Sequence, residues 1–462
     1  MSSPITGNRY SRLSAIDRMM LRVERPATPQ HVAGLCMVEA PPWLDEAGEL
    51  DMDAIRDRLE RRLIRVPELR RVLRRAPLLC GPPLWVDDPG FSIERHVHAT
   101  PAQAPGDEAA LLETVERLLR DRFDCSRPLW DLWLLTGLES GRVGLLFRVH
   151  HALVDGLAAI ALITAFLDLE AGATDPPTTS WRPAPAPSGW ALFRDNARNR
   201  LSKLGSVLAH PVRTARALAP TVGFVARLLP DLNAAPRTSL NAPAGTGRRL
   251  RVVRLDLEAA RKVAHTHEAK VNDLILTVVM GGVRELMLGR GESVAGLELI
   301  VVIPATIRDT DEARELGNAV GALYCRLPAG EADTVRRLDL VAASTRDAKA
   351  TQHLSRQTST LMYGLLGWLS ALGLPMEDQQ RSINFQVSNL RGPEVPLYLL
   401  GARIEEVMPI TVLTGNLTLT VAALSYCGHL NLTVIADRQR CADVDVLTAG
   451  MRRSWAELAV NT

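Results

Sequence analysis

The residues best suited to chemistry in this sequence are two adjacent histidines, His150 and His151, followed by Asp155 and Gly156. A neutral imidazole suits general-base work because its unperturbed pKa lies close to physiological pH. Histidine and aspartate are also metal ligands, so the same residues could instead hold an ion. Which chemistry applies depends on the elements that position the two rings.

The residues before the histidines predict a strand, and those after Gly156 predict a helix. Apolar side chains alternate over residues 143–149, whereas residues 157–169 have the length and apolar spacing of a helix. If the alternation continues, His150 and His151 point to opposite faces. Adjacent histidines on an extended backbone do not easily converge on one ion, and no Cys or Glu cluster nearby completes a shell. We therefore expect no metal, with His151 as the base and His150 as a structural histidine.

Asp155 has two interpretations that can coexist. Directly before a helix, its carboxylate can accept hydrogen bonds from the first free amides, with Gly156 giving freedom to the turn. It could also fix the loop and the imidazole tautomer, either directly or through an arginine such as Arg308.

Composition excludes several classes of protein. Of the 462 residues, 47% are hydrophobic and 23% are charged, which excludes disorder for most of the chain. A nucleic-acid binder would usually carry a basic surplus, but 54 Lys and Arg against 52 Asp and Glu leave a net charge of +2, so we expect no nucleic-acid partner. The six cysteines include no close pair, and the first twenty residues hold no apolar signal-type run, which favours the cytoplasm.

Two stretches could meet a lipid surface. Residues 357–376 form an uncharged run of 20 residues, but Ser, Thr, Gln and four Gly or Pro favour a buried or interfacial segment over a membrane span. Residues 182–227 hold eight Lys or Arg against one acid, on predicted short helices broken at Pro211 and Pro220. This basic stretch is either a solvated connector or a surface that docks on anionic lipid.

A domain boundary is expected at residues 176–187, where five of twelve residues are proline. Strand-like and helix-like segments interleave on both sides of it, which predicts two α/β halves joined by a crossover. A hairpin is expected with its turn near Gly428. The predicted units are an N-terminal half over residues 1–175, a proline-rich and basic helical connector over 176–240, and a C-terminal half over 241–462.

An ordered series of short motifs surrounds the histidines, which themselves belong to an intact HHxxxDG motif over residues 150–156. Those before it are Leu13-Ser14-Ala15-Ile16-Asp17, Pro29-Gln30-His31-Val32, Trp85-Val86-Asp87-Asp88, Glu94-Arg95-His96-Val97 and Arg127-Pro128-Leu129-Trp130. Those after it are Leu240-Asn241, Arg248-Arg249, Val271-Asn272-Asp273, Pro304 with Arg308, Gly317-Asn318, and Ser388-Asn389 with Gly392-Pro393. In this order the chain resembles the bacterial wax ester synthase/diacylglycerol acyltransferases, within the superfamily that contains chloramphenicol acetyltransferase and condensation domains.

The match covers nearly the whole chain except the connector, and it departs from the family at Arg391, where proline is more common. The resemblance implies two chloramphenicol-acetyltransferase-like α/β halves joined by a helical crossover, with an active-site tunnel between them. It also implies that acyl-CoA enters as co-substrate and that neither a metal nor a redox cofactor is needed. His151 would take the proton of the acceptor hydroxyl, with no acyl-enzyme.

Three residues of the second half are further candidates for the site. The neutral side-chain amide of Asn272 could stabilise the oxyanion of the tetrahedral intermediate, or it could cap or cross-link helices. Ser388 and Asn389 follow a strand-like segment and could line the tunnel, or they could form a turn.

The expected activity is transfer of a long-chain acyl group from acyl-CoA to diacylglycerol, with wax ester formation from a fatty alcohol second. Since these acceptors are insoluble in water, peripheral association with a membrane or lipid droplet is expected. Two alternatives stay open: a condensation-type acyltransferase that uses a carrier-protein thioester, and a catalytically silent lipid-binding protein of the same fold.

Overall fold

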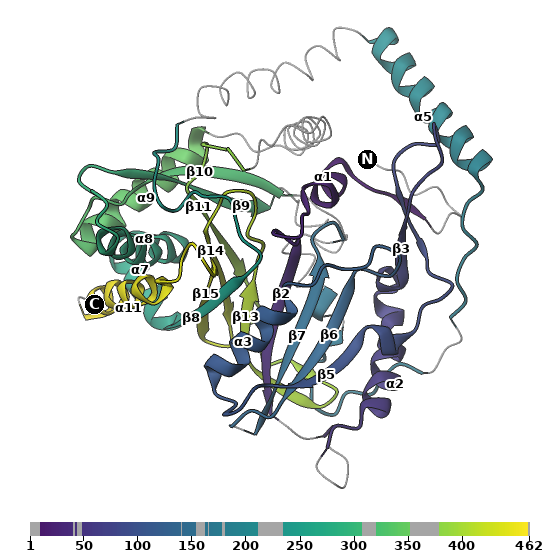
Figure 1. Ribbon diagram of the computed structural model, residues 1–462, viewed down its shortest axis with the longest axis horizontal. Coiled ribbons are helices and arrows are strands. Elements are labelled where there is room, and N and C mark those ends of the chain that lie inside the picture. The colour runs from purple at the N-terminus through teal and green to yellow at the C-terminus, as the bar shows by residue number, and fades with distance from the viewer. Residues whose placement is uncertain are drawn as a thin grey trace.

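The computed structural model describes residues 10–39, 42–43, 49–139, 141–153, 162–164, 166–177, 181–210, 234–306, 320–351 and 378–460. Within them the chain forms a mixed α/β fold of two halves, each built on a six-stranded sheet (Figure 1). This confirms the expected fold class. Asp155, Gly156 and Arg308, and the uncharged run over 357–376, lie outside the described residues.

The first sheet has the strand order β12-β13-β2-β7-β6-β5. Its members from the first half are β2 (His31–Glu39), β7 (Arg142–His150), β6 (Trp130–Thr136) and β5 (Val97–Pro101). The predicted strand before the histidines is therefore present as β7, and it lies between β2 and β6. Its apolar residues serve two different cores, because Phe147 and Val149 face one side of the sheet and Leu146 faces the other.

The other two strands of the first sheet come from the second half of the sequence. They are β12 (Tyr398–Leu399) and β13 (Ala402–Ile410), and β13 pairs antiparallel with β2, with Met408 opposite Leu35. The sequence pattern did not predict this exchange of strands, since period-two alternation identifies a strand but not its partner. The predicted domain limits stay a prediction.

The second sheet has the order β10-β9-β11-β14-β15-β8. These strands are β10 (Val320–Pro328), β9 (Glu298–Thr306), β11 (Phe385–Arg391), β14 (Leu419–Tyr426), β15 (His429–Asp437) and β8 (Arg248–Asp256). The expected hairpin is β14–β15, whose turn has positive φ at Cys427 (46°) and Gly428 (83°). Positive φ at both central residues matches the right-handed twist of paired strands.

Among the described residues, four helices cover the outer face of the second sheet (Figure 1): α7 (Leu257–Thr266), α8 (Val271–Gly289), α9 (Thr334–Thr351) and α11 (Val444–Val460). The apolar residues of α8 are buried nearly all round, so this helix is the centre of the core. Gly282 lets α11 approach closely, since a Cβ there would lie 2.5 Å from the carbonyl oxygen of Leu447.

The first half also carries α1 (Ala15–Val23), α2 (Met52–Arg62), α3 (Glu108–Leu118) and 3₁₀ turns at Leu63–Arg65, Pro67–Arg70 and Ile93–Arg95. A small sheet contains β1 (Ser11–Arg12), β4 (Leu84–Asp87) and β3 (Arg71–Arg74), and α5 (Gly189–Ala209) lies beside it at the upper right of Figure 1.

The two halves share an apolar core between their sheets. Leu35 and Leu146 of the first sheet pack in one cluster with Leu250 and Ile435 of the second. A polar contact also crosses here, since Asn431 Nδ2 of β15 donates to the carbonyl oxygen of Val407 on β13 at 2.9 Å. The halves are thus joined by shared strands and by shared core.

Candidate active site

The candidate base lies where the central strand of the first sheet ends. His150 is the last residue of β7 and pairs with His31, the first residue of β2. His151 begins the turn that follows, and its backbone N–H donates to the carbonyl oxygen of Gln30 at 2.8 Å. The β2–β7 pair therefore holds the backbone of His151 although the residue lies beyond the strand.

His151 itself is partly exposed, while its Nδ1 atom is buried. The ring is therefore neither free in bulk solvent nor enclosed on all sides. Its neighbour His150 is fully buried, and the Nδ1 atom of His150 accepts a hydrogen bond from the backbone N–H of Ala152 at 2.9 Å. An accepting Nδ1 carries no proton, so the neutral ring of His150 has its proton on Nε2.

A buried carboxylate, which the sequence analysis did not identify, faces the Nε2 atom of His150. Glu24 follows the last residue of α1, its side chain is 7% exposed, and its Oε1 atom lies 3.5 Å from Nε2 of His150. The same oxygen accepts the backbone N–H of Gln30 at 3.2 Å. Burial raises the pKa of Glu24, but the nearby ring of His150, the hydrogen bond from the N–H of Gln30 and the charge of Arg122 outweigh burial, so the pKa lies below its usual value.

One signal could have pointed to Glu24. A carboxylate at the C-terminal end of a helix meets the negative end of the helix dipole, so an acid placed there needs a specific partner. The start of the same helix was recognised only as part of a family motif. It is a capping box, in which Ser14 Oγ accepts the N–H of Asp17 at 3.1 Å and Asp17 Oδ2 accepts the N–H of Ser14 at 2.8 Å.

A third imidazole belongs to this cluster. His31 is 4% exposed, its Nε2 atom lies 3.9 Å from Glu24 Oε1, and its ring packs against Phe123 with centroids 4.5 Å apart. Burial, followed by the charge of Arg148, lowers the pKa of His31 well below its ordinary value. His31 is therefore neutral at physiological pH. It carries no positive charge that would compete with His150 for the carboxylate of Glu24.

The candidates of the second half form a linked pair. Asn272 lies in the first turn of α8, and its Oδ1 atom accepts a hydrogen bond from Nδ2 of Asn389 on β11 at 3.4 Å. Ser388 precedes Asn389 within the same strand, so both lie in a strand and not in a turn. All three are partly exposed. The pair leaves the Nδ2 group of Asn272 as its remaining amide donor.

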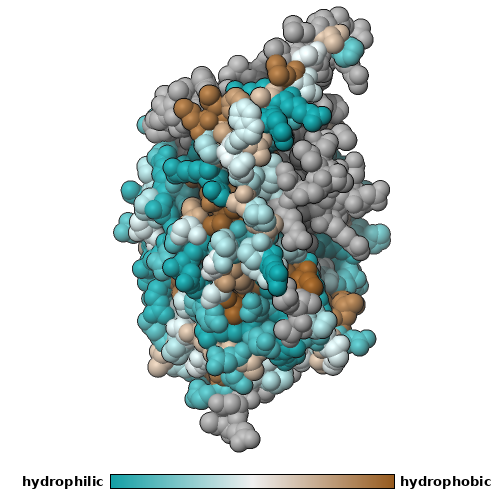
Figure 2. Space-filling view, turned by 90° about the vertical axis from the view of Figure 1, so that its right-hand side faces the viewer, coloured by the Kyte–Doolittle hydropathy of each residue, from teal (hydrophilic) through white to brown (hydrophobic). Residues whose placement is uncertain are grey.

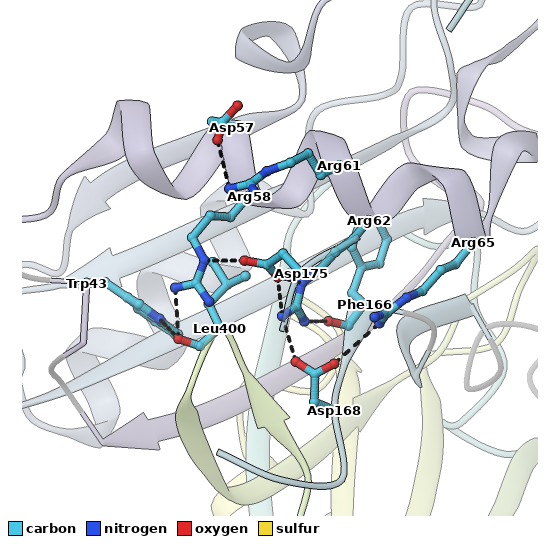
Figure 3. A network of polar contacts seen from close by, with 10 residues as sticks. All are labelled: Trp43, Asp57, Arg58, Arg61, Arg62, Arg65, Phe166, Asp168, Asp175 and Leu400. Carbon is cyan, nitrogen blue, oxygen red and sulfur yellow. Dashed lines mark hydrogen bonds and ion pairs between the residues drawn. The ribbon is translucent and has the colours of Figure 1, made fainter. Parts of the chain in front are cut away.

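Behind the first sheet, α2 anchors the residues around Asp168 (Figure 3). The helix predicted over residues 157–169 does not extend to its expected end, because Asp168 forms a β-bridge with Tyr398. Arg62 is fully buried, with Nη2 2.6 Å from Asp168 Oδ2 and Nε 2.6 Å from Asp175 Oδ1. Asp168 also exchanges two backbone hydrogen bonds with Tyr398 of β12, at 2.8 and 2.9 Å. Arg62 thus stabilises the place where the first half receives strands from the second.

A small apolar cavity lies on the same side of the first sheet. Its volume is about 30 Å³, room for one or two water molecules and not for a fatty chain. Residues lining it include Cys36, Trp130, Leu145, Phe147, Phe166 and Ile404. This cavity is a packing void of the core, and the tunnel expected between the halves stays a prediction.

Solved structures with this architecture define its class. The wax ester synthase/diacylglycerol acyltransferase from Marinobacter aquaeolei superposes with a TM-score of 0.70 at 22% identity, covering 98% of this chain and 99% of that one. The trichothecene 15-O-acetyltransferase from Fusarium sporotrichioides gives 0.67 at 12% identity, covering 97% and 94%. The starter condensation domain of rhizomide synthetase gives 0.58 at 16%, covering 98% and 94%. The fold is therefore the two-lobed fold of acyltransferases and condensation domains.

Sequence comparison then defines the family. The wax ester synthase/diacylglycerol acyltransferase catalytic domain matches residues 13–275, and the C-terminal domain of the same family matches residues 316–459. A probable diacylglycerol O-acyltransferase of Mycobacterium tuberculosis, tgs1, is 27% identical over 460 residues, covering 97% of this chain and 96% of the relative. The chain belongs to the wax ester synthase/diacylglycerol acyltransferase family and is an acyltransferase of that type.

Proposed function

We propose that this enzyme transfers a long-chain acyl group from acyl-CoA to the free hydroxyl of diacylglycerol, and in second place to that of a fatty alcohol. The observation that carries the proposal is the position of His151 in an intact HHxxxDG sequence, with its backbone tied to Gln30 at the end of β7. The family match over both halves supports the substrate class.

In the proposed reaction, His151 removes the hydroxyl proton as the acceptor oxygen attacks the thioester carbonyl. A C–O bond forms, the C–S bond breaks, and the proton passes from His151 to the thiolate of CoA. Acyl transfer is direct, without an acyl-enzyme and without a resident cofactor. A positioned base supplies roughly 10²- to 10⁴-fold, and holding both reactants together supplies more.

The oxyanion of the tetrahedral intermediate needs a donor, and the Asn272–Asn389 pair is the candidate. A neutral amide stabilises developing negative charge without adding a cation beside the imidazolium. The hydrogen bond from Asn389 to Oδ1 orients the Asn272 amide, leaving its Nδ2 group to donate. Ser388 is proposed to line the passage beside this pair, and Asp155 and Arg308 to orient His151.

We further propose that the enzyme works at the surface of a membrane or lipid droplet. No helix in the described part of the chain is both long and apolar enough to cross a bilayer. Apolar side chains are instead exposed around α5, and we call these residues the α5 surface: Leu78 (91% exposed), Leu79 (62%), Trp190 (70%), Phe193 (38%) and Leu201 (68%). Exposed Arg194, Arg198 and Arg200 lie on the same helix.

Contacts on the inner side of α5 hold this surface in place. Leu192 packs in a small cluster with Leu84 and Val86, and Asp195 forms an ion pair with Arg12 at 2.9 Å. Figure 2, which faces the α5 side of the molecule, shows brown apolar atoms beside teal polar ones at its upper end. Exposed apolar residues among arginines fit an anionic lipid interface.

The decisive test of the chemistry is the substitution His151→Ala in a turnover assay. Long-chain acyl-CoA is supplied with diacylglycerol or hexadecanol, and free CoA thiol and the lipid product are both measured. We expect turnover to fall by at least roughly 10²-fold while thermal stability and acyl-CoA binding stay near wild type. Unchanged turnover would refute His151 as the base. Turnover with a carrier-protein thioester but not with acyl-CoA would favour a condensation-type enzyme.

A further inference from the structure

Glu24 is a buried acid that the proposed chemistry does not use directly. Its side chain is 7% exposed at the C-terminal end of α1, where the helix dipole disfavours a negative charge. A carboxylate in such a place is retained only if specific donors satisfy it. Within the described residues its carboxylate accepts the backbone N–H of Gln30 at 3.2 Å and lies 3.5 Å from Nε2 of His150.

These two donors lie on either side of the candidate base along a closed path of contacts. Gln30 donates its N–H to Glu24 and accepts the N–H of His151 with its carbonyl oxygen, at 3.2 and 2.8 Å. His150 directs Nε2 at Glu24, at 3.5 Å, while its Nδ1 accepts the N–H of Ala152, at 2.9 Å. The backbone of His151 is therefore fixed at its own amide and at the amide of the next residue.

The path requires one tautomer of His150. With the proton on Nδ1, the ring would oppose its N–H to the N–H of Ala152 and would present a lone pair to the carboxylate. With the proton on Nε2, both contacts are favourable. An acceptor opposite Nε2 is what selects this form, in the way that an outer carboxylate selects the tautomer of a functional histidine.

We propose that Glu24 is a positioning residue for acyl transfer, which holds His150 as the Nε2–H tautomer and thereby fixes the turn that carries His151. This inference rests on the proposed function, in which His151 is the base. Glu24 acts through an oxygen acceptor placed at the right distance and not through its charge.

The test compares three substitutions of Glu24 in the full-length enzyme. Glu24→Gln keeps an oxygen acceptor at the same reach, Glu24→Asp keeps the charge but shortens the side chain by one CH₂ group, and Glu24→Ala removes both. If position matters, kcat falls by roughly 10- to 100-fold for Glu24→Ala and Glu24→Asp, and by less than about 10-fold for Glu24→Gln. The KM for acyl-CoA should stay close to wild type, because substrate binding is not involved.

Glu116 offers a matched control. Its buried carboxylate also accepts a backbone N–H, that of Leu250 at 2.7 Å, and pairs with Arg438 at 3.0 Å. Glu116→Gln and Glu116→Asp should reduce thermal stability without lowering kcat. Wild-type kcat in Glu24→Asp, or a larger loss in Glu24→Gln than in Glu24→Asp, would overturn the inference.

A second measurement does not depend on activity. In protein labelled with ¹⁵N-histidine, the signals of His150 are assigned by their loss in His150→Gln, and their chemical shifts report the tautomer. We expect the Nε2–H form in the wild type and in Glu24→Gln, and a population of the Nδ1–H form in Glu24→Asp. An Nδ1–H wild type would refute the inference even if acyl transfer is confirmed, whereas absence of acyl transfer would refute the proposed function and leave the tautomer result standing.

Discussion

Several imidazoles of the first half lie in surroundings that disfavour their charged form. Burial is the largest cause for His31, His96 and His98, and it lowers the pKa of each. His96 is stacked on Trp130 with ring centroids 4.7 Å apart, and its Nδ1 atom lies 2.8 Å from the carbonyl oxygen of the same residue. The pKa of His31 is lowered furthest, by burial first and by the nearby charge of Arg148 second.

The shift of His31 predicts how stability depends on pH. As the pH falls below about 6.5, His31 binds a proton in the unfolded chain but not in the folded protein. The free energy of unfolding therefore decreases. Each such proton contributes about 1.4 kcal/mol per pH unit. Urea denaturation between pH 7.5 and pH 5, above the range where most carboxylates titrate, should show this slope. His31→Gln should reduce the slope, whereas substitution of the exposed His429 should leave it unchanged.

At the scale of elements, the ion pairs between α2 and the residues around Asp168 join parts of the chain that are distant in sequence. Arg62 contacts two carboxylates from a fully buried position, and Arg58 Nε binds Asp175 Oδ2 at 2.5 Å and extends Nη1 to the carbonyl oxygen of Leu400 (Figure 3). Removing one partner of a buried ion pair leaves the other charge without compensation.

Arg62→Ala should therefore lower the free energy of unfolding by roughly 3–5 kcal/mol. Arg61 on the same helix is the matched control, because it is partly exposed and pairs with exposed Asp57 at 2.9 Å, one turn away. Arg61→Ala should cost less than about 0.5 kcal/mol. Chemical denaturation of both variants measures the difference, and equal losses would show that burial of Arg62 does not determine its contribution.

At the scale of the whole molecule, the α5 surface is the part of the protein that we propose to contact lipid. The helix lies beside the small sheet and apart from the two large ones, so lipid contact there would not disturb the shared core. Arginines near the exposed apolar side chains should make binding both salt-dependent and selective for anionic lipid.

Flotation with vesicles tests this surface. The wild type should bind vesicles that contain phosphatidylserine more strongly than pure phosphatidylcholine, and binding should weaken with salt. The double substitution Trp190→Ala/Phe193→Ala should reduce binding roughly 10-fold or more, because two apolar side chains are lost. Leu288→Ala and Leu340→Ala, which remove apolar groups 43% and 42% exposed elsewhere, should bind like the wild type. Equal loss in both sets would place lipid contact elsewhere.

The sequence alone determined what depends on neighbours along the chain. Alternation before the histidines predicted β7, and Gly428 marked the turn of β14–β15, because strand and turn preferences act over a few residues. The HHxxxDG motif was recognisable for the same reason, since its residues are contiguous.

Only the tertiary structure decided which distant segments meet. It placed β13 beside β2, linked Asn272 to Asn389, and brought the carboxylate of Glu24 to the ring of His150. Strand pairing and buried polar contacts of this kind are selected by the packing of the whole chain, and period-two or helical spacing carries no information about the partner. The sequence thus supplied the candidate base, and the folded chain shows which contacts surround it.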